Sequence, residues 1–153
     1  MPNPDETNVF LEPLRALQNA LNHFNKRGVI IGCIAVSLLG KPRLTADLDA
    51  MLIASVDQIP EILEVFRGEG LLPRLKEPLP FARRNRMLLL RHTSGTNIDL
   101  SLGFLPFELE VIERSVVVDF EGISLRLPSV EDLIIMKAVA NRERDLQDIR
   151  SLV

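Results

Sequence analysis

Residues 28–54 read GVIIGCIAVSLLGKPRLTADLDAMLIA, and this stretch predicts a strand, a turn, a short helix and a second strand. The first apolar run ends at Gly32, and the apolar residues 34–39 that follow indicate a short helix. A basic loop, Gly40–Arg43, leads into a second apolar run that carries two aspartates.

The two aspartates, Asp47 and Asp49, are two residues apart in the second strand. Because alternate residues of a strand share a face, both carboxylates would project from the same side. Neighbouring carboxylates repel each other, so the pair predicts a bound cation unless one is protonated, and oxygen ligands suit Mg²⁺ or Mn²⁺. Asp99 lies between Ile98 and Leu100 in a later apolar run. A buried carboxylate there needs a cation or hydrogen bonds, which makes Asp99 a natural third member of the group.

The turn at Gly32–Cys33 allows two interpretations. The bare backbone of Gly32 and the N-terminus of the following helix can direct N–H groups at a phosphate. Alternatively, the pair is a plain strand-to-helix turn in which Cys33 is a small buried hydrophobe. The carboxylates that follow favour the first interpretation.

The composition is that of one globular domain spanning residues 1–153, with 46% hydrophobic and 25% charged residues. A net charge of -3 means that any nucleic-acid contact would have to use a local basic patch. The sequence has no apolar run of about 18 residues and no basic start typical of a secretory signal. Its single cysteine cannot form an internal disulfide. We therefore expect a cytoplasmic protein without a membrane span.

Hydrophobic periodicity and turn residues predict the remaining elements. We expect helices over residues 9–27, 55–66 and 129–140, and a short final helix. Residues 102–114 are expected to turn through Gly103 and Pro106 into a further helix. Strands are expected over 87–91 and 97–101, a hairpin over 116–127, and irregular or edge structure over 71–80. The first helix is expected to end at Arg27–Gly28, because glycine tolerates the left-handed cap geometry. Arg83, Arg84 and Arg86 form the basic cluster, which is either a solvated turn between strands or a contact to the phosphates of substrate or RNA.

Three segments together resemble a known superfamily. They are residues 31–49, IGCIAVSLLGKPRLTADLD, residues 98–103, IDLSLG, and residues 128–149, PSVEDLIIMKAVANRERDLQDI. Their order resembles the nucleotidyltransferases of DNA polymerase beta type, and more closely the small bacterial branch related to the AbiE toxins. The resemblance implies an α+β fold, with a mixed sheet flanked by helices. It also implies the metal-dependent transfer of a nucleoside monophosphate from an NTP to a hydroxyl or other acceptor, with release of pyrophosphate.

The resemblance also implies roles for individual residues. Asp47, Asp49 and Asp99 would hold two Mg²⁺ or Mn²⁺ ions, with Asp99 on the ion that activates the attacking hydroxyl. Residues that would contact the nucleotide come from the turn, the basic loop and the start of the second strand: Gly32, Cys33, Lys41, Arg43 and Thr45. Lys137 would lie near the phosphates, and Asp145 matches a carboxylate that the toxin branch uses in its site.

Two functional hypotheses and one structural hypothesis follow. The first is a minimal nucleotidyltransferase, the toxin-like member of a defence or toxin–antitoxin system, with RNA or protein as acceptor and an antitoxin or other protein as partner. The second is a nucleotide-binding or regulatory protein that has lost transfer activity. It is motivated by Cys33, where this superfamily commonly has Gly or Ser, and by a C-terminal region shorter than that of the toxins. In the third, the aspartates form only a structural ion or hydrogen-bond site.

Overall fold

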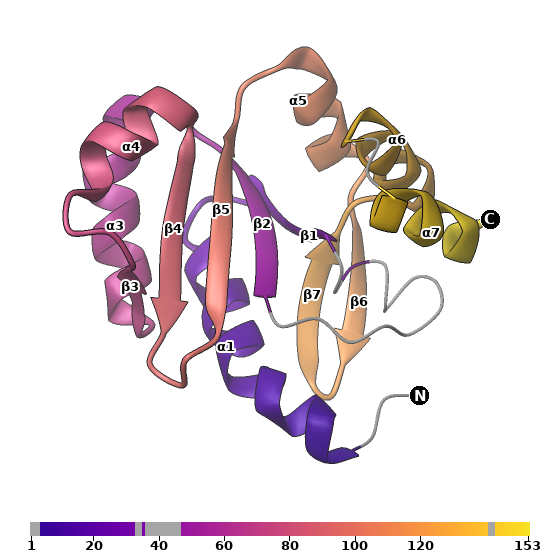
Figure 1. Ribbon diagram of the computed structural model, residues 1–153, viewed down its shortest axis with the longest axis horizontal. Helices are drawn as coiled ribbons and strands as arrows, with labels where there is room; N and C mark the ends of the chain where they lie inside the picture. Colours follow the sequence, from indigo (N-terminus) through magenta and orange to yellow (C-terminus); the bar gives the residue numbers. More distant parts are fainter. Residues whose placement is uncertain (1–3, 33–34, 36–46, 141–142) are drawn as a thin grey trace.

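The computed structural model describes residues 4–32, 35, 47–140 and 143–153 (Figure 1). Within these residues, five strands form one mixed sheet in the order β1-β2-β5-β4-β3. Strands β2 and β5 are parallel, and the other neighbouring strands are antiparallel. The strands are β1 Gly28–Ile31, β2 Asp47–Ile53, β3 Leu71–Pro73, β4 Met87–His92 and β5 Asn97–Gly103. The predicted α+β fold and the edge position of the segment after residue 70 are confirmed.

Helices and a separate hairpin surround this sheet (Figure 1). They are α1 Pro4–Asn22, the 3-10 turn η1 Val56–Gln58, α3 Ile59–Gly68, α4 Pro78–Asn85, α5 Pro106–Glu113, β6 Val116–Phe120, β7 Ile123–Leu127, α6 Val130–Ala140 and α7 Glu143–Leu152. Strand β7 lies beside β1, and the Gln18 side chain of α1 accepts a hydrogen bond from the backbone N–H of Arg126 at 3.1 Å. None of the described helices is long and apolar enough to cross a bilayer.

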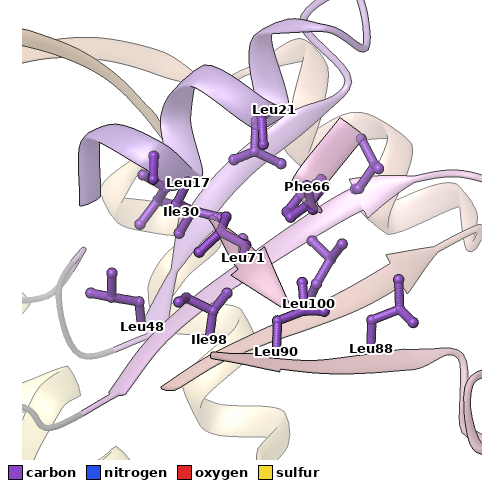
Figure 2. Close-up of a cluster of buried hydrophobic side chains, with 14 of the residues drawn as sticks. Leu17, Leu21, Ile30, Leu48, Phe66, Leu71, Leu88, Leu90, Ile98 and Leu100 are labelled. Atoms are coloured by element: carbon purple, nitrogen blue, oxygen red, sulfur yellow. The ribbon is translucent and has the colours of Figure 1, made fainter. Parts of the chain in front are cut away.

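One face of the sheet is wholly apolar and is covered by α1 and α3 (Figure 2). Alternate residues of the central strands point to it and are fully buried: Leu48, Ala50 and Leu52 of β2, and Ile98 and Leu100 of β5. Leu17 and Leu21 of α1 and Phe66 of α3 pack against them. Full burial of each large side chain contributes about 1.5–3 kcal/mol, so this face dominates the stability of the fold.

The opposite face is divided into two halves. Near Ile53, where β2 ends, this face carries a second, smaller core. It consists of Val29 of β1, Met51 of β2 and Val111 of α5, packed with Phe107 of α5 and Met136 of α6. At the other end of the same face, β2 begins with Asp47 and Asp49. Because residues 47, 49, 51 and 53 share a face, the two aspartates lie on the side that α5 and α6 cover only in part.

The end of the first helix differs from the prediction. Helix α1 ends at Asn22, and the turn after it uses Asn25 and Lys26 with φ of 52° and 62°. Gly28 is the first residue of β1, and a Cβ atom there would lie 2.6 Å from Cδ2 of Leu21. The missing side chain therefore lets α1 pack closely on β1, so the predicted glycine cap at residue 28 is wrong.

The basic cluster also lies in a different element from the predicted turn. Arg83 and Arg84 are exposed in the last turn of α4, and Arg86 caps the helix after Asn85 with φ of 51°. The Arg86 guanidinium turns inward, donating to the carbonyl of Ala54 at 2.7 Å and stacking 4.2 Å from the ring centre of Phe104. The cluster is thus split into two solvent-facing arginines and one structural arginine.

Candidate functional site

Two rows of residues cross the partly covered face of the sheet. In one, Asp49 of β2 is the direct register partner of Asp99 of β5. In the other, Asp47 is the partner of Asn97, which in turn is the partner of Arg91 of β4. Since neighbouring strands lie about 4.8 Å apart, the sequence-distant residues 49 and 99 are adjacent. The prediction that Asp99 belongs with the aspartates of β2 is consistent with this register.

Asp99 has a cationic partner from the edge of the sheet. The Arg74 guanidinium, through Nη2, forms an ion pair with Oδ1 of Asp99. Both side chains are part-buried, with exposed fractions of 19% for Arg74 and 33% for Asp99. The sequence argument that a carboxylate in this strand requires a cation or hydrogen bonds is therefore correct, and Arg74 is such a cation.

Gly32 lies directly against the carboxylate of Asp49. Its φ is 73°, a conformation that glycine adopts without strain. A Cβ atom at residue 32 would collide with the Asp49 carboxylate and lie 3.0 Å from Asp49 Cβ. The bare backbone at the end of β1 is thus required by the neighbouring acidic side chain as well as by the turn.

The donors of this region fit a divalent cation in part. Asp47 and Asp49 offer hard carboxylate oxygens on one face of β2, which is the chemistry that Mg²⁺ and Mn²⁺ prefer. Asp99 is adjacent but paired with Arg74. Across the part of the chain that the structure describes, no three His, Cys, Asp or Glu side chains form a group that could hold a metal ion. The described part therefore offers a two-carboxylate site with a third carboxylate held by a guanidinium.

Lys137 lies in α6, buried rather than directed to solvent. Its Nζ is 3.2 Å from Oδ2 of Asp148 in α7, and both side chains are at least nine-tenths buried. The neighbouring Met136 packs on the face of the sheet that carries the aspartates. Lys137 therefore helps to join α6 to α7, while α6 lies over the face of the predicted site.

Several predicted site residues fall outside the described part of the chain. Cys33, Lys41, Arg43 and Thr45 lie outside the described residues, as does most of the predicted helix 34–39. Asp145 belongs to α7, and its side chain is also outside the described part. The nucleotide-binding roles of these residues stay predictions.

The start of α6 is fixed by a pair of charged residues. Ser129 Oγ accepts a hydrogen bond from the backbone N–H of Asp132 at 3.2 Å, as an N-capping hydroxyl does. The Asp132 carboxylate accepts two hydrogen bonds from Arg114, at 2.9 and 2.8 Å. These hydrogen bonds hold the pKa of Asp132 below its usual value and raise the pKa of Arg114. The ion pair joins the end of α5 to the start of α6, the two helices of the second core.

Sequence reasoning missed Arg74, Asn97 and Arg91. Arg91 Nε donates to Oδ1 of Asn97 at 2.9 Å, so the row that begins with Asp47 ends in a cation. Strand register brings these residues together, and no local motif in the sequence gives that register. The only indication in the sequence was that Asp99, a carboxylate in an apolar strand, needs a cation or hydrogen bonds.

Comparisons with known proteins agree with this geometry. A family of nucleotidyltransferases of unknown function (DUF6036) matches residues 11–153. A comparison with curated proteins gives no significant match.

Solved structures with a similar fold include three whose names describe nucleotidyl transfer. An antigenic nucleotidyltransferase-like protein from Paracoccidioides brasiliensis gives a TM-score of 0.63 at 18% identity, covering 97% of this chain and 76% of its own. A Thermotoga maritima protein provisionally identified as a nucleotidyltransferase gives 0.62 at 16% identity, covering 98% and 93%. The lincosamide antibiotic adenylyltransferase LnuA, solved with lincomycin bound, gives 0.56 at 12% identity, covering 98% and 96%. At these identities the likeness shows the fold.

Proposed function

Because the chain belongs to the DUF6036 family of nucleotidyltransferases, we propose that it transfers a nucleoside monophosphate from an NTP to a hydroxyl-bearing acceptor. The acceptor oxygen would form a bond to the α-phosphorus, pyrophosphate would leave, and the hydroxyl proton would pass to solvent or a nearby base. The observation that carries the proposal is the direct pairing of Asp49 with Asp99, with Asp47 on the same face. Two strands that are far apart in the sequence thus place their acidic side chains next to each other.

Asp47 and Asp49 are the residues that would hold a Mg²⁺ or Mn²⁺ ion. When bound, such an ion would neutralise phosphate charge and stabilise the attacking and leaving oxygens. Gly32 supports this assignment, because its missing side chain lets the Asp49 carboxylate lie directly against the end of β1, beside the backbone that would receive the triphosphate. Asp99 lies next to Asp49 and would face the attacking hydroxyl once Arg74 has moved from it.

Phosphate binding is assigned to the segment after β1. The backbone at Gly32 and Cys33 would receive the triphosphate, Lys41 and Arg43 would contribute charge, and Thr45 would support the site. Lys137 already contacts Asp148, so a direct contact between Lys137 and a phosphate would need an exchange of partners. The role of Asp145 is proposed on the resemblance alone.

The acceptor that we propose is RNA or a protein, in the setting of a cytoplasmic toxin–antitoxin or defence system with an antitoxin as partner. Support for RNA comes from Arg83 and Arg84, which are exposed on α4 and available to phosphates. The relation to AbiE toxins rests on the sequence resemblance. Because LnuA is named as a lincosamide adenylyltransferase, small-molecule hydroxyl acceptors belong in the same test.

The test is transfer of label from each α-³²P-labelled NTP, with Mg²⁺ or Mn²⁺, to bacterial RNA, bacterial protein or lincomycin. Asp49→Asn should lower transfer by more than about 100-fold, because a lost metal ligand removes several kcal/mol of transition-state stabilisation. Asp57→Asn, which changes an exposed carboxylate in η1, is the matched control and should transfer at the wild-type rate. Equal transfer by wild type and Asp49→Asn, with both folded by circular dichroism, would refute the mechanism.

A second function is favoured by one specific observation, the ion pair between Arg74 and Asp99. If that pair persists when nucleotide binds, the protein would bind Mg-NTP without transferring it. This hypothesis predicts saturable, metal-dependent NTP binding in calorimetry and no release of pyrophosphate with any acceptor. Pyrophosphate release that depends on an acceptor would exclude it.

A further inference from the structure

Arg74 reaches Asp99 from the edge of the sheet. It follows β3 directly, and its backbone N–H donates to the carbonyl of Leu89 in β4 at 2.9 Å. Leu89 is the register partner of Asp99. Strand β4 therefore lies between the Arg74 backbone and Asp99, and the Arg74 side chain reaches past Leu89 to place Nη2 on the carboxylate.

Among the described residues, the Arg74 guanidinium has one side-chain partner, Asp99. Nη2 contacts Asp99, whereas Nε is buried and has no hydrogen-bond partner within the described residues. An arginine offers five N–H donors, and a stably fixed one usually satisfies several of them. The position of the Arg74 side chain thus depends on its backbone hydrogen bond and on one carboxylate. The guanidinium can leave that carboxylate for another anionic group.

A guanidinium and a divalent ion would compete for the negative charge of the Asp99 carboxylate. The guanidinium neutralises the carboxylate and occupies Oδ1, and a second cation within about 4 Å would be repelled by its charge. We propose that Arg74 occupies the cation position of Asp99, so that a divalent ion binds to this carboxylate only after the guanidinium has left. The inference rests on the proposed function, because it assumes metal binding at Asp47 and Asp49.

Arg74 then has a positioning role with two states. In the first, the guanidinium neutralises Asp99 and a metal binds only through the carboxylates of β2. In the second, Asp99 is open to a metal, and the released guanidinium is free to meet an anionic oxygen of the substrate. Because both side chains are part-buried and partly solvated, the pair is of moderate strength and a divalent ion can displace the guanidinium.

The experiment is titration of Mn²⁺ alone, followed by electron paramagnetic resonance of the free ion, into the full chain and its variants. Arg74→Gln should bind Mn²⁺ about fivefold more tightly than wild type, or should bind an additional ion. A fivefold gain is the factor expected when an ion pair of this strength no longer competes with the metal. Arg91→Gln removes a positive charge from the neighbouring row without a described contact to Asp99, and should change the affinity less than about twofold. The gain should vanish in the double variant Arg74→Gln/Asp99→Asn.

The outcomes separate this inference from the proposed function. If wild type binds Mn²⁺ through Asp47 and Asp49 and Arg74→Gln gains no more than Arg91→Gln, the inference is wrong and the proposed function stands. If neither wild type nor Arg74→Gln binds Mn²⁺, both are wrong. Should Arg74→Gln fail to fold, Arg74→Met keeps the apolar stem that crosses Leu89 and should show the same gain.

Discussion

The two faces of the central sheet use the same strands for opposite purposes. On β2 and β5, Leu48 and Leu100 point to a face that is buried completely beneath α1 and α3. Asp49 and Asp99, their neighbours in sequence, point to the other face and are only part-buried. A one-residue step along either strand therefore changes the surroundings from a packed core to a cluster of charges.

The contrast between the faces shows where this fold tolerates unfavourable interactions. Two carboxylates in direct register repel each other, and like charges on facing strand positions are destabilising. The buried face contributes enough hydrophobic stabilisation to offset that repulsion, and Arg74 reduces it further. Variants of the buried face should therefore destabilise the fold, and variants of the charged face should change its chemistry.

The largest effect is expected from Leu100→Ala. Its side chain is fully buried against α1 and α3, so truncation should lower the free energy of unfolding by about 2–5 kcal/mol. Urea denaturation followed by circular dichroism measures the change. A loss below about 1 kcal/mol would show that the two faces do not differ as described.

Gly32→Ala should cost less stability and should disturb the site. Alanine at φ of 73° is disfavoured by about 1–2 kcal/mol, and its Cβ would also collide with the Asp49 carboxylate. Gly122→Ala is the matched control, because Gly122 has φ of 81° and no atom beyond its chain neighbours lies within 4 Å of the position that a Cβ would take. We expect similar thermal destabilisation from the backbone in both variants, with an additional loss of stability and of NTP transfer in Gly32→Ala alone.

Asp99→Asn should lower NTP transfer strongly while leaving the free energy of unfolding almost unchanged. The ion pair that it weakens is part-exposed, so the free energy of unfolding should change by less than about 1 kcal/mol. NTP transfer should fall more than about tenfold, because a neutral amide neither holds a metal nor accepts a proton as well as a carboxylate. The measurement is label transfer and urea denaturation on the same preparation; a stability loss as large as that of Leu100→Ala would contradict the division between faces.

The smallest effect is expected from Asp132→Asn, which weakens the ion pair that joins α5 to α6 over the second core. Near neutral pH the melting temperature should fall by a few degrees. Because the folded pKa of Asp132 lies below its unfolded value of 3.8, its stabilisation is complete above that pH and is lost as the pH falls further, through the folded pKa. The difference from wild type should therefore shrink below about pH 3.8, whereas the exposed-carboxylate control Asp119→Asn should differ little at any pH.

Much of this arrangement could be predicted from the sequence, because periodicity and local chemistry determine it. The apolar alternation around Asp47 and Asp49 predicted a strand with both carboxylates on one face, which is confirmed. The position of Asp99 in an apolar strand predicted that it needs a cation or hydrogen bonds, and Arg74 supplies a cation. The AbiE branch and the metal stay predictions.

The errors arose where packing over long distances decides the outcome. Gly28 was predicted to be a helix cap, but its role depends on the approach of Leu21 from α1. The identity of Arg74 as the partner of Asp99 depends on the register of β3 against β4 and of β4 against β5, which no single segment contains. Arg86 was grouped with its basic neighbours, although its cap position turns it inward to Ala54.

The parallel pairing of β2 with β5 also has a consequence for the order of folding. Residues 49 and 99 meet only after a segment of about fifty residues has closed into a loop, an entropic cost that slows non-local strand pairing. The hairpin of β4 and β5 is local and can form earlier. A growing chain that has not yet emerged from the ribosome as far as β5 therefore cannot assemble the carboxylate pair, even though β2 has been made long before.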